Sequence, residues 1–238
     1  DIIVCRSEYP LDQQLRSKIA LFCNVPASHV LQNLDVDILY EAPLAMEQEH
    51  LAEVACQCLK LDCPEPDLED WKNMVNALKH PTSEVTVALV GKYITLHDAY
   101  ISVVEALKHG GIASHSVVNI KWVDSETVTP DNVAELLGDV NGILVPGGFG
   151  SRGIEGKITA IEYARTHNIP FLGLCLGMQL SIVEYARHVL KYTDAHSIEL
   201  DPKTTHPVID LMPDQNGVED IGGTLRLGSY PCVLNKDS

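Results

Sequence analysis

The pattern of apolar and polar positions is most regular after Ser83, where it predicts alternating strands and helices. Apolar runs typical of buried strands occupy residues 85–90, 117–123, 143–145 and 169–174. Helix-forming stretches follow them at residues 99–109, 129–138, 156–166 and 176–190. Such alternation is typical of a parallel sheet with helices on both faces. We therefore predict an α/β fold with a doubly wound, mostly parallel sheet.

Helix-boundary residues refine this prediction. Asp98 is placed to cap the helix after the first of these strands, and Gly110-Gly111 to end it. Pro130 stands at the first position of the next helix, and Gly138 closes that helix. After Tyr192 polar residues and prolines replace the pattern, so no element is predicted there.

The first 84 residues have a less regular pattern. Their predicted elements are a strand at 2–5, a helix at 11–22, an extended piece at 36–40, and helices at 45–60 and 71–78. The run Cys63-Pro64-Glu65-Pro66-Asp67 separates the last two helices, because proline cannot continue a helix. We place a domain boundary close to Ser83.

Composition narrows the classes of partner. The formal net charge of −16 disfavours a nucleic-acid partner, because such binding depends on basic side chains that meet phosphates. No run approaches the eighteen or so apolar residues of a membrane-spanning helix, so we expect no membrane partner. The chain opens at Asp1 inside a strand pattern, and we expect it to belong to a longer protein without a secretory leader.

Seven cysteines at irregular spacing indicate a reducing, cytoplasmic environment rather than a disulfide framework. Cys56, Cys58 and the nearby Cys63 could suggest a metal site. Two residues spaced i, i+2 on a helix face different directions, however, and no histidine follows at zinc-finger spacing. We therefore predict no metal site in this chain.

The segment with the most specific chemistry is Gly173-Leu174-Cys175-Leu176-Gly177. A buried strand enters it and a helix leaves it, which is the pattern of a nucleophile elbow with cysteine in place of serine. The helix N-terminus favours the thiolate, and its amides can hold the oxyanion formed when a carbonyl is attacked. We predict that Cys175 is a catalytic nucleophile rather than a small buried side chain.

The glycine-rich loop 146–150 follows the neighbouring strand. Ligands of parallel sheets bind at the carboxyl ends of strands, so this loop is expected to bring backbone amides beside Cys175. A general base is not evident among the ten histidines. His188 is expected to point away from the elbow, and His206, which no acid follows, is expected to be a solvated loop residue.

These residues resemble the triad-type glutamine amidotransferases and, among them, the CTP synthase family. The segments that carry the resemblance are 91–93, 102–107, 145–150, 173–179, 185–187 and 222–228. Residues 18–26 are similar to the end of the synthetase domain of that family. The resemblance implies that residues 1–43 end a synthetase domain, 44–84 form a linker with helices, and 85–238 form an amidotransferase domain.

The resemblance also implies site residues. Cys175 would form a glutamyl thioester, and the ammonia released would aminate UTP to CTP at a site that uses ATP and Mg²⁺. Glutamine would be bound by Gly148, Leu176, Gly177, Met178, Gln179 and Glu199. UTP, CTP or ATP would be bound by Lys18, Leu34, Asp35 and Val36. GTP would activate the enzyme through a lid at residues 222–228, with Arg226 as its charged contact. The full-length enzyme would be a cytoplasmic homotetramer.

The sequence departs from the family in two respects. The phosphate-binding loop of the synthetase domain is absent, and so is the His-Pro-Glu that completes the catalytic dyad. We therefore expect these 238 residues alone to make no CTP and to hydrolyse glutamine poorly.

Two alternatives remain open. One is another cysteine hydrolase of the same fold, although such enzymes usually place a histidine soon after the cysteine. The other is a non-catalytic regulatory module, whose activity would not depend on Cys175.

Overall fold

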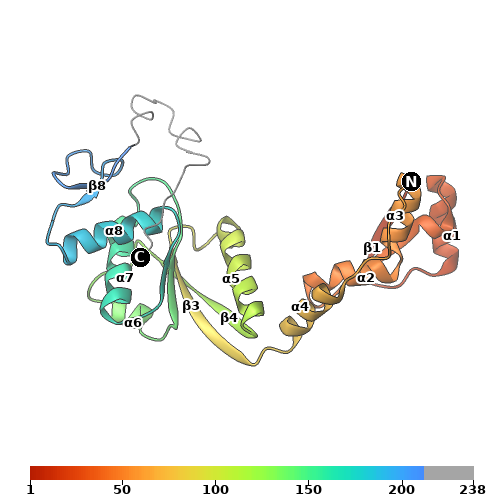
Figure 1. Ribbon diagram of the computed structural model, residues 1–238, viewed down its shortest axis with the longest axis horizontal. Coiled ribbons are helices and arrows are strands. Elements are labelled where there is room, and N and C mark those ends of the chain that lie inside the picture. The colour runs from red at the N-terminus through yellow and green to blue at the C-terminus, as the bar shows by residue number, and fades with distance from the viewer. Residues whose placement is uncertain (212–238) are drawn as a thin grey trace. The chain divides into compact units, whose positions relative to one another are not determined.

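A computed structural model describes residues 1–211, and the chain forms two compact units (Figure 1). One unit contains Asp1–Glu84 and Leu107–Val117, and the other contains Val85–Ala106 and the chain from Val118 onwards. The expected lid 222–228, its Arg226, and Cys232 lie outside the described residues.

The first unit is built on two parallel strands, β1 and β2, which pair in register from Ile3 with Val30 to Ser7 with Leu34. Its elements are β1 (Ile3–Ser7), α1 (Gln13–Cys23), β2 (Val30–Leu34), α2 (Ala42–Gln48), α3 (Leu51–Leu59) and α4 (Glu69–Lys79). The Asp12 side chain caps α1 by accepting from the N–H of Leu15 at 2.7 Å.

A half-buried ion pair connects α1 to the C-terminal end of α2. Arg16 Nη1 lies 2.7 Å from Glu49 Oε2 and donates to the carbonyl of Val30 at 2.9 Å. Hydrogen bonding to the guanidinium, opposed by burial, lowers the pKa of Glu49. Glu49 also accepts from the Gln32 amide at 2.9 Å, so one carboxylate joins three segments of the unit.

The second unit contains a sheet of four strands in the order β4-β3-β5-β6. From β3 onwards the elements are β3 (Ser83–Gly91), α5 (Ile101–Ala113), β4 (Ser116–Asp124), α6 (Val133–Leu137), β5 (Gly142–Val145), α7 (Ile154–Thr166), β6 (Phe171–Gly173), α8 (Leu176–His188), β7 (His196–Ser197) and β8 (Pro207–Ile209). Strand β5 pairs in parallel with both β3 and β6. The predicted α/β fold with a mostly parallel sheet is confirmed.

Helices α7 and α8 pack against each other and against β5 and β6 (Figure 1). Their apolar side chains form a core with the strands, which includes Ile143, Val145, Ile158 and Leu180. Arg165 on α7 forms a bidentate ion pair with Glu184 on α8, with the nearest atoms 2.7 Å apart. The Glu184 side chain is 1% exposed, so this pair stabilises the two helices in one relative position.

Several predicted boundaries are wrong in the first unit. The predicted helix 45–60 is two helices, because His50 adopts a left-handed conformation between α2 and α3. The second strand lies at 30–34 rather than at 36–40, where a short 3₁₀ turn, Leu39–Glu41, forms instead.

Expectations about both ends of α5 and about the tail after Tyr192 are also wrong. Gly110-Gly111 does not end α5, which continues to Ala113, and a 3₁₀ turn at His97–Tyr100 stands where Asp98 was expected to cap it. The polar tail after Tyr192 contains the short parallel pair β7 and β8, which was not predicted.

Candidate active site

Cys175 occupies a tight turn between β6 and α8. Its backbone has φ 51° and ψ −106°, a conformation that residues with a side chain rarely adopt. Its side chain is solvent-exposed. Strain of this kind persists only where the surrounding structure imposes it, and it is concentrated at functional sites.

Gly173 and Gly177, which flank the elbow, leave no room for a side chain because neighbouring backbone atoms are too close. A Cβ atom on Gly173 would lie 2.5 Å from the backbone carbon of Gly177. A Cβ atom on Gly177 would in turn overlap the carbonyl oxygen of Val145, at the end of β5. The backbones of β5, the turn and α8 are therefore in direct contact, with no side chain between them. This close contact imposes the conformation of Cys175.

The glycine-rich loop after β5 lies beside the nucleophile, as the sequence predicts. A Cβ atom on Gly147 would lie 3.3 Å from Cys175 Cβ and 3.8 Å from its sulfur. Lys92, at the end of β3, donates a hydrogen bond from its ammonium to the carbonyl of Phe149 in the same loop. The carboxyl ends of β3, β5 and β6 thus contribute to one site.

The backbone amides at the start of α8 differ in availability. The N–H of Gly177 donates to the carbonyl of Leu174 at 2.9 Å, and that of Gln179 donates to Cys175 at 3.1 Å. Leu176 is the first residue of the helix, so its N–H has no acceptor earlier in the helix. An oxyanion beside Cys175 would therefore take its donor from Leu176 rather than from Gly177.

The other predicted glutamine-binding residues differ in exposure. Met178 is exposed and Gln179 is half-buried in the first turn of α8, three and four residues after Cys175. Glu199 is exposed in the turn that follows β7. Gly148 lies in the loop beside Lys92, whose Cε would be 3.6 Å from a Cβ atom at this glycine.

The predicted nucleotide-binding residues belong to the first unit. Lys18 is exposed on α1, and Leu34 is the last residue of β2. Asp35 follows it, and its carboxylate lies 2.7 Å from the guanidinium of Arg6.

Buried polar groups that the sequence did not reveal lie in α7 and beside it. The Lys157 side chain is fully buried, and its Nζ has no hydrogen-bond partner in the described part of the chain. Burial, together with the charge of Lys92, lowers the pKa of Lys157 to about 8. Ser125 is also buried, and its backbone packs where Gly156 has no side chain. From sequence alone, a lysine in a helix is expected to be solvated. Only the three-dimensional packing shows that Lys157 is buried.

His206, which was expected to be a solvated loop residue, has a carboxylate partner. His206 Nδ1 lies 2.5 Å from Asp194 Oδ1, and its ring stacks on Tyr192 at 4.6 Å. Hydrogen bonds from Thr205, followed by the one from His206, hold the pKa of Asp194 well below its usual range. The acid precedes the histidine by twelve residues, whereas the His-Pro-Glu of the family places its acid after the histidine. Within residues 1–211 no histidine is hydrogen-bonded to the Cys175 thiol.

Comparisons with known proteins agree with this geometry. Residues 95–238 match the family model "Glutamine amidotransferase class-I", and residues 1–61 match "CTP synthase N-terminus". The whole chain is 57% identical to the CTP synthase of Clostridium acetobutylicum and 52% identical to that of Bacillus licheniformis. In each case it spans 44% of the relative's length.

A solved structure is also similar. The glutaminase domain of Trypanosoma brucei CTPS, with bound acivicin, matches with a TM-score of 0.53 and 40% identity. The match covers 55% of this chain and 51% of the other. These comparisons confirm the resemblance inferred from the sequence. As to membranes, no helix in the described residues is long and apolar enough to span one.

Proposed function

Because the chain belongs to the class-I glutamine amidotransferase family, we propose that Cys175 hydrolyses the side-chain amide of glutamine. The observation that carries this proposal is the exposed thiol on a strained elbow beside the 146–150 loop. A nucleophile held at a helix N-terminus next to backbone donors is the arrangement that acyl transfer requires.

The chemistry proceeds through a thioester. The Cys175 thiolate attacks the amide carbon, and the carbonyl oxygen becomes an oxyanion held by the N–H groups of Leu176 and Gly148. Collapse of this intermediate breaks the C–N bond, and the nitrogen takes a proton and leaves as ammonia. Water then attacks the thioester and releases glutamate and the thiol. A base must move these protons, and the proposal assigns it to no histidine of residues 1–211.

The remaining glutamine contacts are assigned by position. Met178 and Gln179 follow the nucleophile on α8 and would line the substrate site. Glu199 would accept a hydrogen bond from the α-amino group of glutamine. Gly177 would contribute through the close backbone fit that positions Cys175, because its own N–H is already bonded.

The whole protein is proposed to be a CTP synthase. ATP would phosphorylate the 4-oxygen of UTP, and ammonia from the glutamine site would displace that phosphate to give CTP. The proposal assigns residues 1–43 to the end of the synthetase domain, 44–84 to a linker and 85–238 to the amidotransferase domain. Lys18 would contact nucleotide phosphate, and residues 34–36 would line the ATP site.

Mg²⁺, activation by GTP, a homotetramer and a cytoplasmic location belong to the same proposal. Asp35 is the acidic residue of the 34–36 segment, but its carboxylate is already paired with Arg6. No residue of this segment is therefore assigned to the metal.

Two activities of the full-length protein test the proposal. Cys175→Ala is expected to abolish CTP formation with glutamine while retaining CTP formation with ammonium chloride, because free ammonia bypasses the thioester. Cys23→Ala, which removes an exposed cysteine of α1, is the matched control and should retain both activities. Incubation with a glutamine-like diazoketone should add one adduct to the wild type and none to Cys175→Ala.

The alternatives give different results. A cysteine hydrolase of another kind would lose its activity in Cys175→Ala but would form no CTP from UTP, ATP and ammonia. A regulatory module would retain all its activity in Cys175→Ala. Either result would overturn the proposal.

A further inference from the structure

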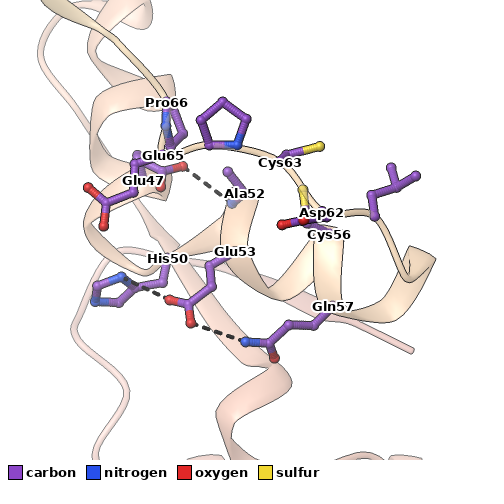
Figure 2. A pocket seen from close by; sticks show the side chains of 12 residues that line it. Glu47, His50, Ala52, Glu53, Cys56, Gln57, Asp62, Cys63, Glu65 and Pro66 are labelled. Carbon is purple, nitrogen blue, oxygen red and sulfur yellow. Dashed lines mark hydrogen bonds and ion pairs between the residues drawn. The ribbon is translucent and has the colours of Figure 1, made fainter.

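Two thiols from different segments of the first unit meet at the rim of one cavity. Cys56 lies in the last turns of α3, and Cys63 lies in the extended segment that follows this helix. Both side chains line this cavity, although they come from different segments. Figure 2 shows both sulfur atoms on the same side of the helix end.

The chain path that brings them together is defined by hydrogen bonds. Lys60 adopts a left-handed conformation, φ 56° and ψ 40°, at the end of α3. The N–H of Leu61 then donates to the carbonyl of Cys56 at 2.9 Å, and that of Lys60 donates to Gln57 at 3.2 Å. This pair of bonds is a Schellman motif, which reverses the chain over the last helical turn. Pro64 restricts the residue before it to an extended conformation, so the position of Cys63 is constrained from both sides.

The surroundings of the two thiols are acidic and open. They line a cavity of about 590 Å³ together with the carboxylates Glu47, Glu53, Asp62 and Glu65 (Figure 2). Cys63 is exposed, whereas Cys56 is half-buried. The hydrogen bond with Cys63, followed by burial, raises the pKa of Cys56. Cys63 is therefore the more accessible of the two thiols to a small oxidant, and Cys56 lines the same cavity.

A metal ion fits this pair less well than covalent chemistry does. Among the described residues, the one group of three potential ligands within 4.8 Å of one another is Glu162, Glu184 and His188, in the other unit. Cys56 and Cys63 thus have no third ligand already in place, whereas structural zinc requires four. Formation of a disulfide requires only that the two sulfurs approach each other, and no further group.

We propose that Cys56 and Cys63 form a dithiol modification site that a hydroperoxide oxidises reversibly to a disulfide. The Cys63 thiolate attacks the peroxide, an S–O bond forms, the O–O bond breaks, and hydroxide or alkoxide leaves with a proton. The Cys56 thiol then attacks the sulfenic sulfur, an S–S bond forms, and the hydroxyl leaves as water. Both sulfurs are oxidised and the peroxide is reduced, so no other reactant is needed.

The sequence offers a direct readout. Cleavage by trypsin after Lys18, Lys60 and Lys72 yields peptides 19–60 and 61–72. Cys63 is the one cysteine of the second peptide, so the two peptides stay together only if Cys63 is cross-linked. The full-length protein is treated with limiting hydrogen peroxide, its remaining thiols are alkylated, and it is digested without reductant.

The expected result is a linked peptide whose mass is the sum of the two less two hydrogen atoms, and which dithiothreitol separates. Cys56→Ser should abolish it. Cys58→Ser is the matched control: Cys58 lies two residues away, is equally half-buried, and contacts His29 at 3.7 Å, so this variant should keep the linked peptide. Separate peptides after treatment, with Cys63 alkylated or over-oxidised, would overturn the proposal. A linked peptide that persists in Cys56→Ser would do the same.

Discussion

A Cβ atom on Gly177 would overlap the carbonyl oxygen of Val145, so the first turn of α8 and the end of β5 are in backbone contact. At this point no side chain lies between α8 and β5. This contact places Cys175 beside the loop that leaves β5, because both segments begin within a few residues of it. The geometry of the site thus depends on a glycine that performs no chemistry.

Gly177→Ala should destabilise the protein by about 3 kcal/mol, at the upper end of the usual cost of overpacking, because backbone has little freedom to move away. It should also reduce glutamine hydrolysis, since any shift of α8 displaces the Leu176 amide. Urea unfolding and a glutaminase assay of the same preparation measure both effects. A variant with the stability and activity of the wild type would contradict the contact.

Gly110→Ala is the matched control and carries a prediction of the opposite sign. Gly110 lies inside α5, and a Cβ atom there would meet nothing within 4 Å. Alanine restricts the unfolded chain and favours the helix, so this variant should be more stable by about 1 kcal/mol. A loss of stability in urea unfolding would mean that α5 does not run through Gly110 in solution.

The sequence predicted the elbow and the sheet well because both depend on local patterns. An apolar run that ends in Gly173, with a second glycine at Gly177 four residues later, is visible in one short window. The break at His50 was missed because a left-handed histidine leaves no mark in an apolar pattern. The pair of Asp194 with His206 and the burial of Lys157 depend on tertiary packing, which no local window contains.

The backbone strain at Cys175 predicts that a residue needed for catalysis lowers the free energy of unfolding. Its φ of 51° with ψ −106° is accessible to glycine without a Cβ clash. Cys175→Gly should therefore be more stable than Cys175→Ala by about 1–3 kcal/mol, while neither variant hydrolyses glutamine. Thermal unfolding of the two inactive variants measures the difference without any effect of substrate. Equal unfolding temperatures would show that the turn relaxes once the thiol is removed.

The buried ammonium of Lys157 should make the stability difference between the wild type and Lys157→Met depend on pH. Its pKa falls from 10.5 in the unfolded chain to about 8 in the folded protein, because burial disfavours its charge. Below pH 8 the folded state holds this charge at a cost on the order of 3 kcal/mol. As the pH rises from about 8 towards 10.5, the unfolded chain binds the additional proton, and the cost is relieved. Lys157→Met should therefore stabilise the protein most below pH 8, and its advantage should shrink as the pH approaches 10.

Urea unfolding of both proteins at several pH values between 7 and roughly 10 tests this dependence. Lys203→Met, which replaces an exposed lysine of the same unit, is the control and should show no such trend. A constant difference between wild type and Lys157→Met across this range would mean that Lys157 keeps its charge, and that an anion or water pairs with it in solution. A destabilised Lys157→Met would lead to the same conclusion, because a paired ammonium contributes stability that methionine cannot replace.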